Sequence, residues 1–343
     1  MSEIYYSQTP QWKEFLAKIK QTFRLYLPQA KGDDYLYQED KHSEQFSFNS
    51  YRTVQPIKSF FFYPKEKVAE DFLSPATLEK PIPTVVAGLK NCDLHSLKVQ
   101  DFVFKQGIEV DPLYNLRREN TILISGDCTG FKEVCFCLAL EVLPHPTEGF
   151  DLNLSLLTDG FLVEVGSQKG KNLIEKYQRY FIQAKQSQIS ARSAKRQSLI
   201  DELNRHLTKQ NLPPKEILQK IIKKGYNSGI WEDFCLDCVE CGACNFICCT
   251  CHCFLLSDVQ ERNQSPRLRV WDSCQYANFA RVAGGANPLK RRAQRLRNRF
   301  EKKFDFFIDN LGMPACEGCG RCIEACPAKI DIREVLKDLA KNV

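Results

Sequence analysis

The chain has 343 residues, of which 43% are hydrophobic and 26% charged, and its formal net charge is +6. This composition is typical of a soluble globular protein with room for two domains. No apolar run approaches the roughly 20 residues that a membrane-spanning helix needs, so we expect no membrane insertion. The first 15 residues hold neither a basic leader nor an apolar segment, so we expect no secretory signal and a cytoplasmic location.

Short apolar segments mark the first 180 residues. Their β-branched and aromatic content and their Gly and Pro borders predict strands, at residues 59–64, 84–89, 121–126 and 160–166. Helical stretches such as residues 168–186 lie between or after them. The pattern predicts an α/β domain over residues 1–180, although it does not give the order of the strands.

The chain becomes polar, basic and helical from about Gln183. Residues 211–225, NLPPKEILQKIIKKG, begin with prolines and end with lysines and a glycine, which are helix start and stop signals. We therefore expect a helical linker over residues 181–230. A cysteine-rich domain would follow over residues 231–343.

The 17 cysteines are interpreted through the expected compartment. Cytosolic thiols stay reduced, so a cysteine-dense cytosolic chain more often binds metal or takes part in redox chemistry than forms disulfides. Their number is also odd, which rules out complete internal pairing. Metal binding is therefore the favoured interpretation.

Eight cysteines form two copies of the spacing C-x2-C-x2-C-x3-C. The first copy has Cys238, Cys241, Cys244 and Cys248, and the second has Cys316, Cys319, Cys322 and Cys326. In bacterial ferredoxins, three cysteines of such a run bind one [4Fe–4S] cluster and the fourth binds the other cluster. Structural zinc is the alternative, but zinc sites usually use two separated cysteine pairs.

This exchange of fourth ligands predicts two [4Fe–4S] clusters. Cluster 1 would be bound by Cys238, Cys241, Cys244 and Cys326, and cluster 2 by Cys316, Cys319, Cys322 and Cys248. The two runs lie about 70 residues apart and helical segments flank both. We therefore expect residues 231–343 to form a mainly α-helical ferredoxin-type domain rather than a compact β-hairpin one.

Several phrases resemble one family of proteins. They include GLKNCDLHSL, SGDCTGFKEVCFC, CGACNFICCTCHCF, WDSCQYANFARVAGGANP and CEGCGRCIEACP, in this order. The family is that of the beta subunit of cytosolic sulfhydrogenases and the A subunit of anaerobic sulfite reductase. One departure is Cys249, which stands where the family usually has proline.

The resemblance implies an electron-transfer subunit of a hetero-oligomeric oxidoreductase of anaerobic metabolism. Its partners would be a flavin- and NAD(P)-binding subunit and a catalytic subunit, of hydrogenase, sulfite reductase or heterodisulfide-reductase-like type. The resemblance does not carry the terminal acceptor with it. Because no GxGxxG or P-loop occurs, we expect no nucleotide site in this chain, and we expect His95 to be structural.

The cysteines of the first domain suggest a third metal centre. They are Cys92, Cys128, Cys135 and Cys137, and four is the number that a third cluster needs. The alternative is that they are small buried hydrophobic residues. A third centre with a vacant or non-cysteine ligand would make the chain a catalytic reductase subunit, which is the rival functional hypothesis.

Two further features leave alternatives open. Cys251, Cys253 and Cys274 form another candidate group, with His252 or Asp272 as a fourth ligand, whereas we expect Cys235 and Cys249 not to be ligands. Residues 287–303 contain eight basic residues and one acidic residue. They form either a solvated helix face that docks an acidic partner or a source of charge that neutralises anionic clusters. We expect no nucleic-acid binding, because no known binding fold is recognised.

Overall fold

The computed structural model describes residues 3–40, 47–71, 74–79, 81–260 and 265–342. The chain forms two compact units that interleave along the sequence. The first unit comprises Met1–Ile57, Lys80–His95 and Leu116–Lys209, and the second comprises Lys58–Glu79, Ser96–Asn115 and Gln210–Val343. The division of the chain at residues 180 and 230 stays a prediction. Along the sequence, segments of the two units alternate, and they already do so before residue 180.

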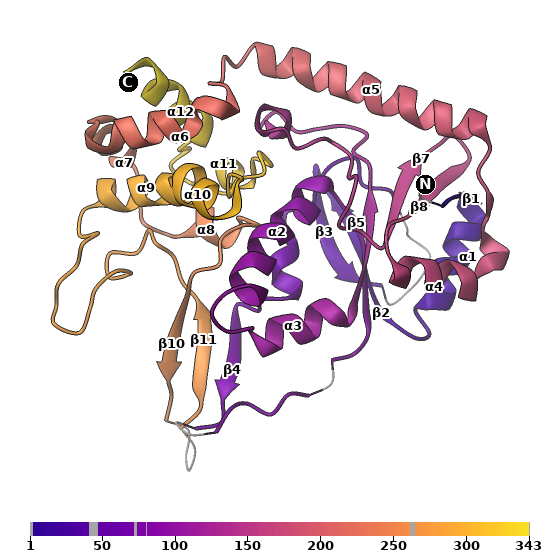
Figure 1. Ribbon diagram of the computed structural model, residues 1–343, viewed down its shortest axis with the longest axis horizontal. Helices are drawn as coiled ribbons and strands as arrows, with labels where there is room; N and C mark the ends of the chain where they lie inside the picture. The colour runs from indigo at the N-terminus through magenta and orange to yellow at the C-terminus, as the bar shows by residue number, and fades with distance from the viewer. Residues whose placement is uncertain (1–2, 41–46, 72–73, 80, 261–264, 343) are drawn as a thin grey trace. The chain divides into compact units, whose positions relative to one another are not determined.

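An eight-stranded mixed sheet forms the centre of the first unit (Figure 1). The strand order is β3-β2-β5-β6-β7-β8-β1-β9, and β2, β5, β6 and β7 run parallel to their neighbours within that group. The strands are β1 (Ile4–Gln8), β2 (Arg24–Lys31), β3 (Asp34–Glu39), β5 (Thr84–Leu89), β6 (Thr121–Gly126), β7 (Leu152–Leu156), β8 (Gly160–Val165) and β9 (Ile182–Gln183). This sheet confirms the α/β character expected of the N-terminal part.

Helices cover this sheet and bury its apolar side chains. They include α1 (Thr9–Ile19), α4 (Gln168–Lys176) and the long α5 (Gln186–Thr208). The amphipathic α1 buries Trp12, Phe15 and Ile19 in a core that also contains Val85 and Ile124 of the central strands. The apolar residues of α1 recur at helical spacing, and β5 and β6 are apolar along their length. The core therefore lies between this helix and the sheet.

Three of the four predicted strands are confirmed, as β5, β6 and β8. The prediction for residues 59–64 was wrong. Its first residues lie in the 3₁₀ helix η1 (Ile57–Phe60), and Phe61 and Phe62 follow in a turn that buries both rings in the second unit. An apolar run of this length fits a buried turn as well as a buried strand, because periodicity cannot separate them.

The second unit combines short helices with a small sheet. Its helices are α6 (Lys215–Lys224), α7 (Ile230–Cys235), α8 (Ala243–Phe246), α9 (Arg292–Glu301), α10 (Phe307–Leu311), α11 (Arg321–Glu324) and α12 (Ile332–Lys341). A π-helical segment, η5 (Lys302–Phe306), joins α9 to α10. Figure 1 shows these helices gathered together. The expected helix at residues 211–225 is confirmed as α6, which Gly225 terminates.

An antiparallel sheet of order β10-β11-β4 completes the second unit (Figure 1). It consists of β10 (Phe254–Asp258), β11 (Arg267–Trp271) and β4 (Lys65–Ala69). The sequence did not predict this sheet, since β4 comes from a distant part of the chain and β10 is largely exposed. In the described part of the chain, every helix is too short or too polar to cross a membrane.

Candidate metal centres

The two cysteine runs fold alike. Glu240 and Gly242 in the first run have φ of +58° and +73°, and Gly318 and Gly320 at the equivalent positions of the second run have +62° and +70°. A four-residue helix follows each pair, α8 in the first run and α11 in the second. A side chain at Gly242 would also lie 2.9 Å from Cβ of Ser273. The sequence repeat is therefore a structural repeat, with left-handed residues that turn the backbone sharply between cysteines.

The cysteines predicted for cluster 1 line one cavity. Cys238, Cys241 and Cys244 reach it from the first run, and Cys326 reaches it from the second. Cys322 also lines this cavity, and apolar side chains of α9 and α12 form much of the rest of its wall. The structure thus places a cysteine of the second run beside three of the first, as the exchange of fourth ligands requires.

The cysteines predicted for cluster 2 are also close to one another. Burial raises the pKa of Cys316, and the negative charges of Cys322 and Cys248 raise it further. Burial likewise raises the pKa of Cys322, where Cys248 and Cys319 add to the effect. The thiol of Cys249 hydrogen-bonds with both Cys248 and Cys319. Cys248 of the first run therefore lies within electrostatic range of Cys316 and Cys322 of the second run.

Three buried cations surround the segment that follows the first run. Lys58 Nζ donates hydrogen bonds to the carbonyl oxygens of Asn245 and Cys251, at 3.0 Å and 2.9 Å. Lys303 Nζ lies 3.2 Å from Cys248 Sγ. Arg299, which is 5% exposed, lines the cavity that holds the cluster 1 cysteines. None of the three forms an ion pair with a carboxylate of the described residues.

The charges of these cations test whether the site fits an anionic cluster. Burial by itself lowers the pKa of Lys303, but the negative charges of Cys248 and Cys251 outweigh it and raise the pKa above its usual value. The same balance holds for Arg299, whose pKa the surrounding thiolates raise. Buried cations are costly unless an anion compensates them. The thiol-rich, carboxylate-free surroundings therefore fit an iron–sulfur cluster with its negative charge.

The geometry expected of thiolates differs between a single metal ion and a cluster. Among the described residues, no group of three or more His, Cys, Asp or Glu side chains is arranged to hold one metal ion. Thiolates around a single zinc must approach one point, with Zn–S near 2.3 Å. The four thiolates of a [4Fe–4S] cube each bind a different iron, so they stand farther apart.

Asn245 connects the cysteine groups, and the sequence analysis did not single it out. Its Nδ2 donates to Ser273 Oγ at 2.9 Å and to Cys274 Sγ at 3.1 Å, while its Oδ1 accepts from Arg299 Nε at 3.1 Å. Its position inside the first run, directly after Cys244, is the signal that could have found it. The amide fixes the side chains of Cys274 and Arg299 relative to α8.

Asn245 contacts two members of the candidate group of Cys251, Cys253 and Cys274. Cys251 Sγ donates to its Oδ1 at 3.6 Å, and its Nδ2 donates to Cys274 Sγ at 3.1 Å. Burial raises the pKa of Cys253, and Cys274 and Asp272 contribute in the same direction. Cys251 also hydrogen-bonds with the thiol of Cys248. Burial lowers the pKa of His252 to about 4, and its Nδ1 lies 3.0 Å from the carbonyl oxygen of Thr250. A further metal at this group stays a prediction.

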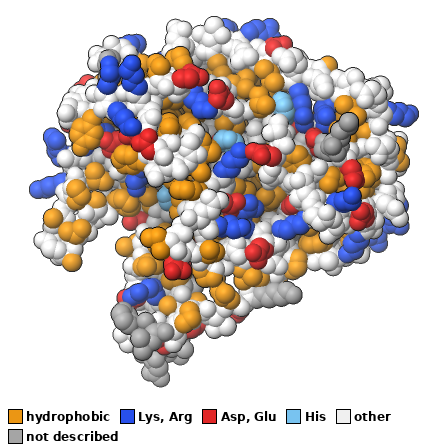
Figure 2. Space-filling view, in the orientation of Figure 1, with side chains coloured by type: hydrophobic (Ala, Val, Ile, Leu, Met, Phe, Trp, Pro, Cys, Tyr) orange, Lys and Arg blue, Asp and Glu red, His pale blue; other side chains and the backbone are white. Residues whose placement is uncertain are grey.

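The basic segment of residues 287–303 turns three of its eight basic side chains inward. Arg295, Arg299 and Lys303, spaced four residues apart on one helix face, are 2%, 5% and 3% exposed. Arg295 forms an ion pair with Glu240. These three side chains do not belong to a solvated helix face, and the alternative that they neutralise anionic clusters stays a prediction. On the face drawn in Figure 2, Lys and Arg side chains are interspersed with Asp and Glu.

The four cysteines of the first unit follow the carboxyl ends of parallel strands. Cys92 lies in the first turn of α2 (Asn91–Lys105), which follows β5, and Cys128 comes two residues after β6. Cys137 begins η2 (Cys137–Leu140), and Cys135 lies two residues before it. Burial raises the pKa of Cys137 well above its usual value, and the charges of Cys135 and Cys128 raise it further. Three of the four cysteines are thus neighbours at an edge where α/β sheets commonly hold ligands.

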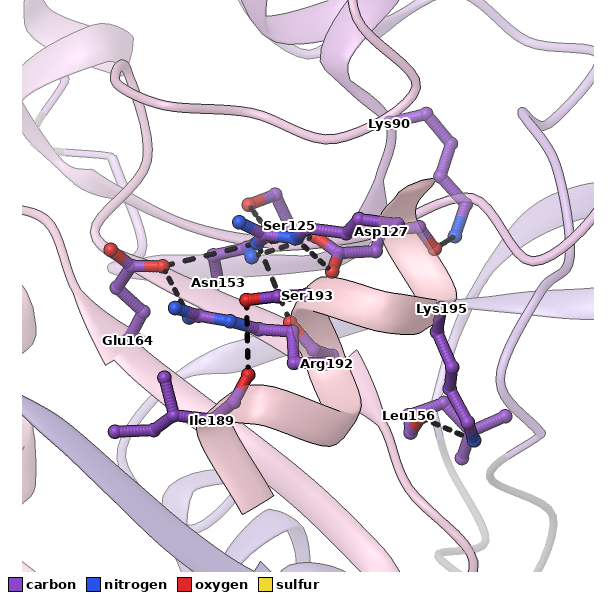
Figure 3. Close-up of polar contacts among 12 residues, drawn as sticks. Lys90, Ser125, Asp127, Asn153, Leu156, Glu164, Ile189, Arg192, Ser193 and Lys195 are labelled. Carbon is purple, nitrogen blue, oxygen red and sulfur yellow. Dashed lines mark hydrogen bonds and ion pairs between the residues drawn. The ribbon is translucent and has the colours of Figure 1, made fainter. Parts of the chain in front are cut away.

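A buried lysine accompanies these cysteines. Lys90 Nζ donates to the carbonyl oxygen of Asp127 at 2.8 Å (Figure 3) and lies 4.3 Å from the ring centroid of Phe48. Burial lowers its pKa to about 8, while the charges of Cys128, Asp127 and Cys92 oppose the shift. Burial also raises the pKa of Cys128 to about 12. Cys92 and Cys128 therefore both lie within electrostatic range of one buried cation.

Comparison with known proteins gives two matches. Residues 237–330 match the 4Fe-4S dicluster domain family. The whole chain is 31% identical to sulfhydrogenase 2 subunit beta of Pyrococcus furiosus over 332 residues, which cover 96% of each chain. The N-terminal α/β sheet is thus followed by a 4Fe-4S dicluster domain, and the role of the chain is iron–sulfur electron transfer.

Proposed function

Because the chain belongs to the family of sulfhydrogenase beta subunits, we propose that it relays electrons through two [4Fe–4S] clusters between two partner subunits. One partner binds flavin and NAD(P), and the other is a catalytic oxidoreductase subunit of hydrogenase, sulfite reductase or heterodisulfide-reductase-like type. The relative carries the name of a subunit, which supports a hetero-oligomer. Each cluster supplies a one-electron redox centre when bound.

The observation that carries the proposal is the cavity shared by three cysteines of the first run and Cys326 of the second. Such a crossing of the two runs supports cluster 1 at Cys238, Cys241, Cys244 and Cys326. The neighbours of Cys248 support cluster 2 at Cys316, Cys319, Cys322 and Cys248. Four thiolates leave no iron with an open position, so the clusters move electrons and do not bind substrate.

A second candidate function is a catalytic reductase with a third centre in the first unit. It is favoured by the neighbouring thiols of Cys128, Cys135 and Cys137 and by buried Lys90, which has no carboxylate ion pair among the described residues. A third cluster with four cysteine ligands would extend the electron relay. A centre in which Cys92 does not bind iron would leave a position for substrate.

Anaerobically purified protein tests the first proposal. We expect about eight irons and eight sulfides per chain, reducible EPR signals, and no substrate turnover until the partner subunits are added. Replacing Cys326→Ser should remove or convert one cluster. The matched control Cys235→Ala, whose thiol donates to the carbonyl oxygen of Glu232, should leave both clusters intact. Fewer than four irons in the wild-type protein, or equal iron in both variants, would contradict the proposal.

Iron content also separates the two candidate functions. About twelve irons per chain, reduced to about eight by Cys128→Ser, would establish a third cluster in the first unit. Turnover of a small substrate by the isolated chain with an artificial electron donor would establish the reductase instead. Retention of all iron in Cys128→Ser would exclude a cluster at this cysteine.

A further inference from the structure

Arg299 is a buried arginine whose hydrogen bonds are incomplete. It lies on α9, and its Nε donates to Asn245 Oδ1 at 3.1 Å. Its Nη2 is buried and has no hydrogen-bond partner in the described structure. It also forms no ion pair with a described carboxylate. A buried guanidinium with a free donor and no counter-anion is costly, so a ligand that is both an acceptor and an anion is expected beside it.

Arg295, one turn earlier on the same helix, shows that the fold can satisfy a buried arginine. Its guanidinium forms an ion pair with Glu240 and donates to the carbonyl oxygens of Gln275 at 3.0 Å and Leu289 at 2.8 Å. Arg295 therefore holds backbone segments together. Arg299 has a single hydrogen-bond partner in the described part of the chain, the side chain of Asn245. The difference indicates that Arg299 does not mainly hold backbone segments together.

The neighbours of Arg299 come from both predicted cluster sites. Arg299 lines the cavity with the cysteines of cluster 1. Its positive charge interacts with Cys244 of cluster 1 and with Cys322 and Cys248 of cluster 2. Among the described residues that line this cavity, Arg299 is the only Lys or Arg.

We propose that Arg299 is a positioning residue shared by the two clusters, whose fixed charge and free Nη2 donor raise the reduction potentials of both. This inference rests on the function proposed above. Reduction adds one electron to a cluster, and no proton moves and no covalent bond changes at Arg299. A nearby positive charge stabilises the more negative reduced state more than the oxidised state. Hydrogen bonds to cluster sulfur act in the same direction.

The shared position has a second consequence. When one cluster is reduced, its added charge makes reduction of the other cluster harder, and this repulsion is strong in a low-dielectric interior. A cation that interacts with both clusters raises both potentials, so it counteracts the lowering of the second potential by this repulsion. Arg299 therefore favours reduction of both clusters in one molecule.

The experiment compares Arg299→Gln, Arg299→Lys and Arg291→Gln in the full chain with clusters bound. Arg291 is a matched control because it lies at the start of the same helix with its side chain 70% exposed. Redox titrations followed by EPR would give the midpoint potential of each cluster, with iron content and thermal unfolding measured alongside. For Arg299→Gln we expect at least a tenfold fall in the reduced-to-oxidised ratio of both clusters at the wild-type midpoints, about 59 mV for a one-electron couple.

The other variants separate charge from structure. Arg299→Lys keeps the charge, so its midpoints should lie between those of the wild type and Arg299→Gln, and Arg291→Gln should match the wild type. If Arg299→Gln fails to bind iron while Arg299→Lys binds both clusters, the result supports a requirement for positive charge at this position when the clusters assemble.

Three results would overturn the proposal. One is an Arg299→Gln protein with both clusters and unchanged midpoints, and another is a shift in one cluster alone. The third is failure of both Arg299 variants to bind clusters, which would make the residue a structural one. A wild-type protein without two reducible clusters would instead overturn the proposed function itself, together with this inference.

Discussion

In the first unit the partly buried arginines of α5 are paired with carboxylates, whereas in the second unit three buried cations have none among the described residues. Arg196 donates two hydrogen bonds to Asp127, at 2.8 Å and 2.9 Å, and Arg192 donates to Glu164 at 2.9 Å (Figure 3). Asn153 completes the network with a hydrogen bond to Asp127 at 3.0 Å. These charges are balanced by the protein itself.

The cations of the second unit, Lys58, Arg299 and Lys303, face thiols and carbonyl oxygens. The first unit also has one buried cation of this kind. Lys90 forms no ion pair with a described carboxylate and lies near Cys92 and Cys128. The chain pairs Arg269 and Arg295 of the second unit with carboxylates, but it leaves Lys58, Arg299 and Lys303 without one among the described residues. The difference indicates where an anionic group belongs to the folded state.

Removing iron and sulfide should therefore destabilise the second unit far more than the first. Loss of the counter-anion of a buried cation typically costs about 3–5 kcal/mol, and three cations are affected here. Amide hydrogen exchange before and after anaerobic chelation would measure the effect. We expect protection to be lost in α8, α9 and α11 and kept in β7 and β8. Equal loss in both units would show that the uncompensated cations do not depend on clusters.

In the first unit, Asp127→Asn should remove a counter-charge that the protein itself supplies. It removes the carboxylate that accepts two hydrogen bonds from Arg196 and leaves only Glu164, at 3.9 Å, in a site where Asp127 is 5% exposed. We therefore expect a loss of about 3 kcal/mol in the free energy of unfolding. Chemical denaturation would measure the loss. The double variant Asp127→Asn with Arg196→Gln should recover part of it, and the iron of the dicluster domain should be unchanged. A single variant as stable as the wild type would contradict the structural role of the pair.

Local sequence patterns predicted much of the fold. The strands β5, β6 and β8 and the helix α6 were found because each has its own apolar pattern and borders. The sheet of β4, β10 and β11 was missed because it joins segments some 200 residues apart and shows no alternation in β10. Pairing over such distances leaves no local signal.

The candidate site was predictable to the same degree. The spacing of the two runs predicted two sets of cysteine ligands, which stay a prediction. One cavity is lined by Cys326 and three cysteines of the first run, together with Cys322. The roles of Lys58 and Asn245 could not be predicted, since they depend on contacts between distant segments. Arg299 and Lys303 left a weaker signal. Four-residue spacing with Arg295 placed them on one helix face, beside the apolar Leu296 and Phe300.

Replacing Lys303→Gln should sharpen the contrast between a local and a shared cation. Lys303 Nζ lies 3.2 Å from Cys248 Sγ and 3.8 Å from Cys251 Sγ, so its charge acts mainly on cluster 2. We expect the midpoint of cluster 2 to fall by about 59 mV, a tenfold change in its reduced fraction, and that of cluster 1 to fall less. The neighbouring Lys302→Gln serves as the control. EPR-monitored titration would measure both clusters, and equal shifts in the two would contradict a local effect.

The smallest effect is expected at His145, which borders the balanced network of the first unit. Burial lowers its pKa below the usual 6.5, the charges of Arg196 and Arg192 lower it further, and Asp127 and Glu164 oppose them. Because the unfolded chain binds the proton more tightly, stability conferred by neutral His145 is present above pH 6.5 and is lost as the pH falls through the lowered pKa. Unfolding measured from pH 7.5 to 5 should show a shallower decline in His145→Asn than in the wild type. An identical decline in both proteins would place the acid sensitivity in the carboxylates of the network, whose pairing with Arg192 and Arg196 is itself lost on protonation.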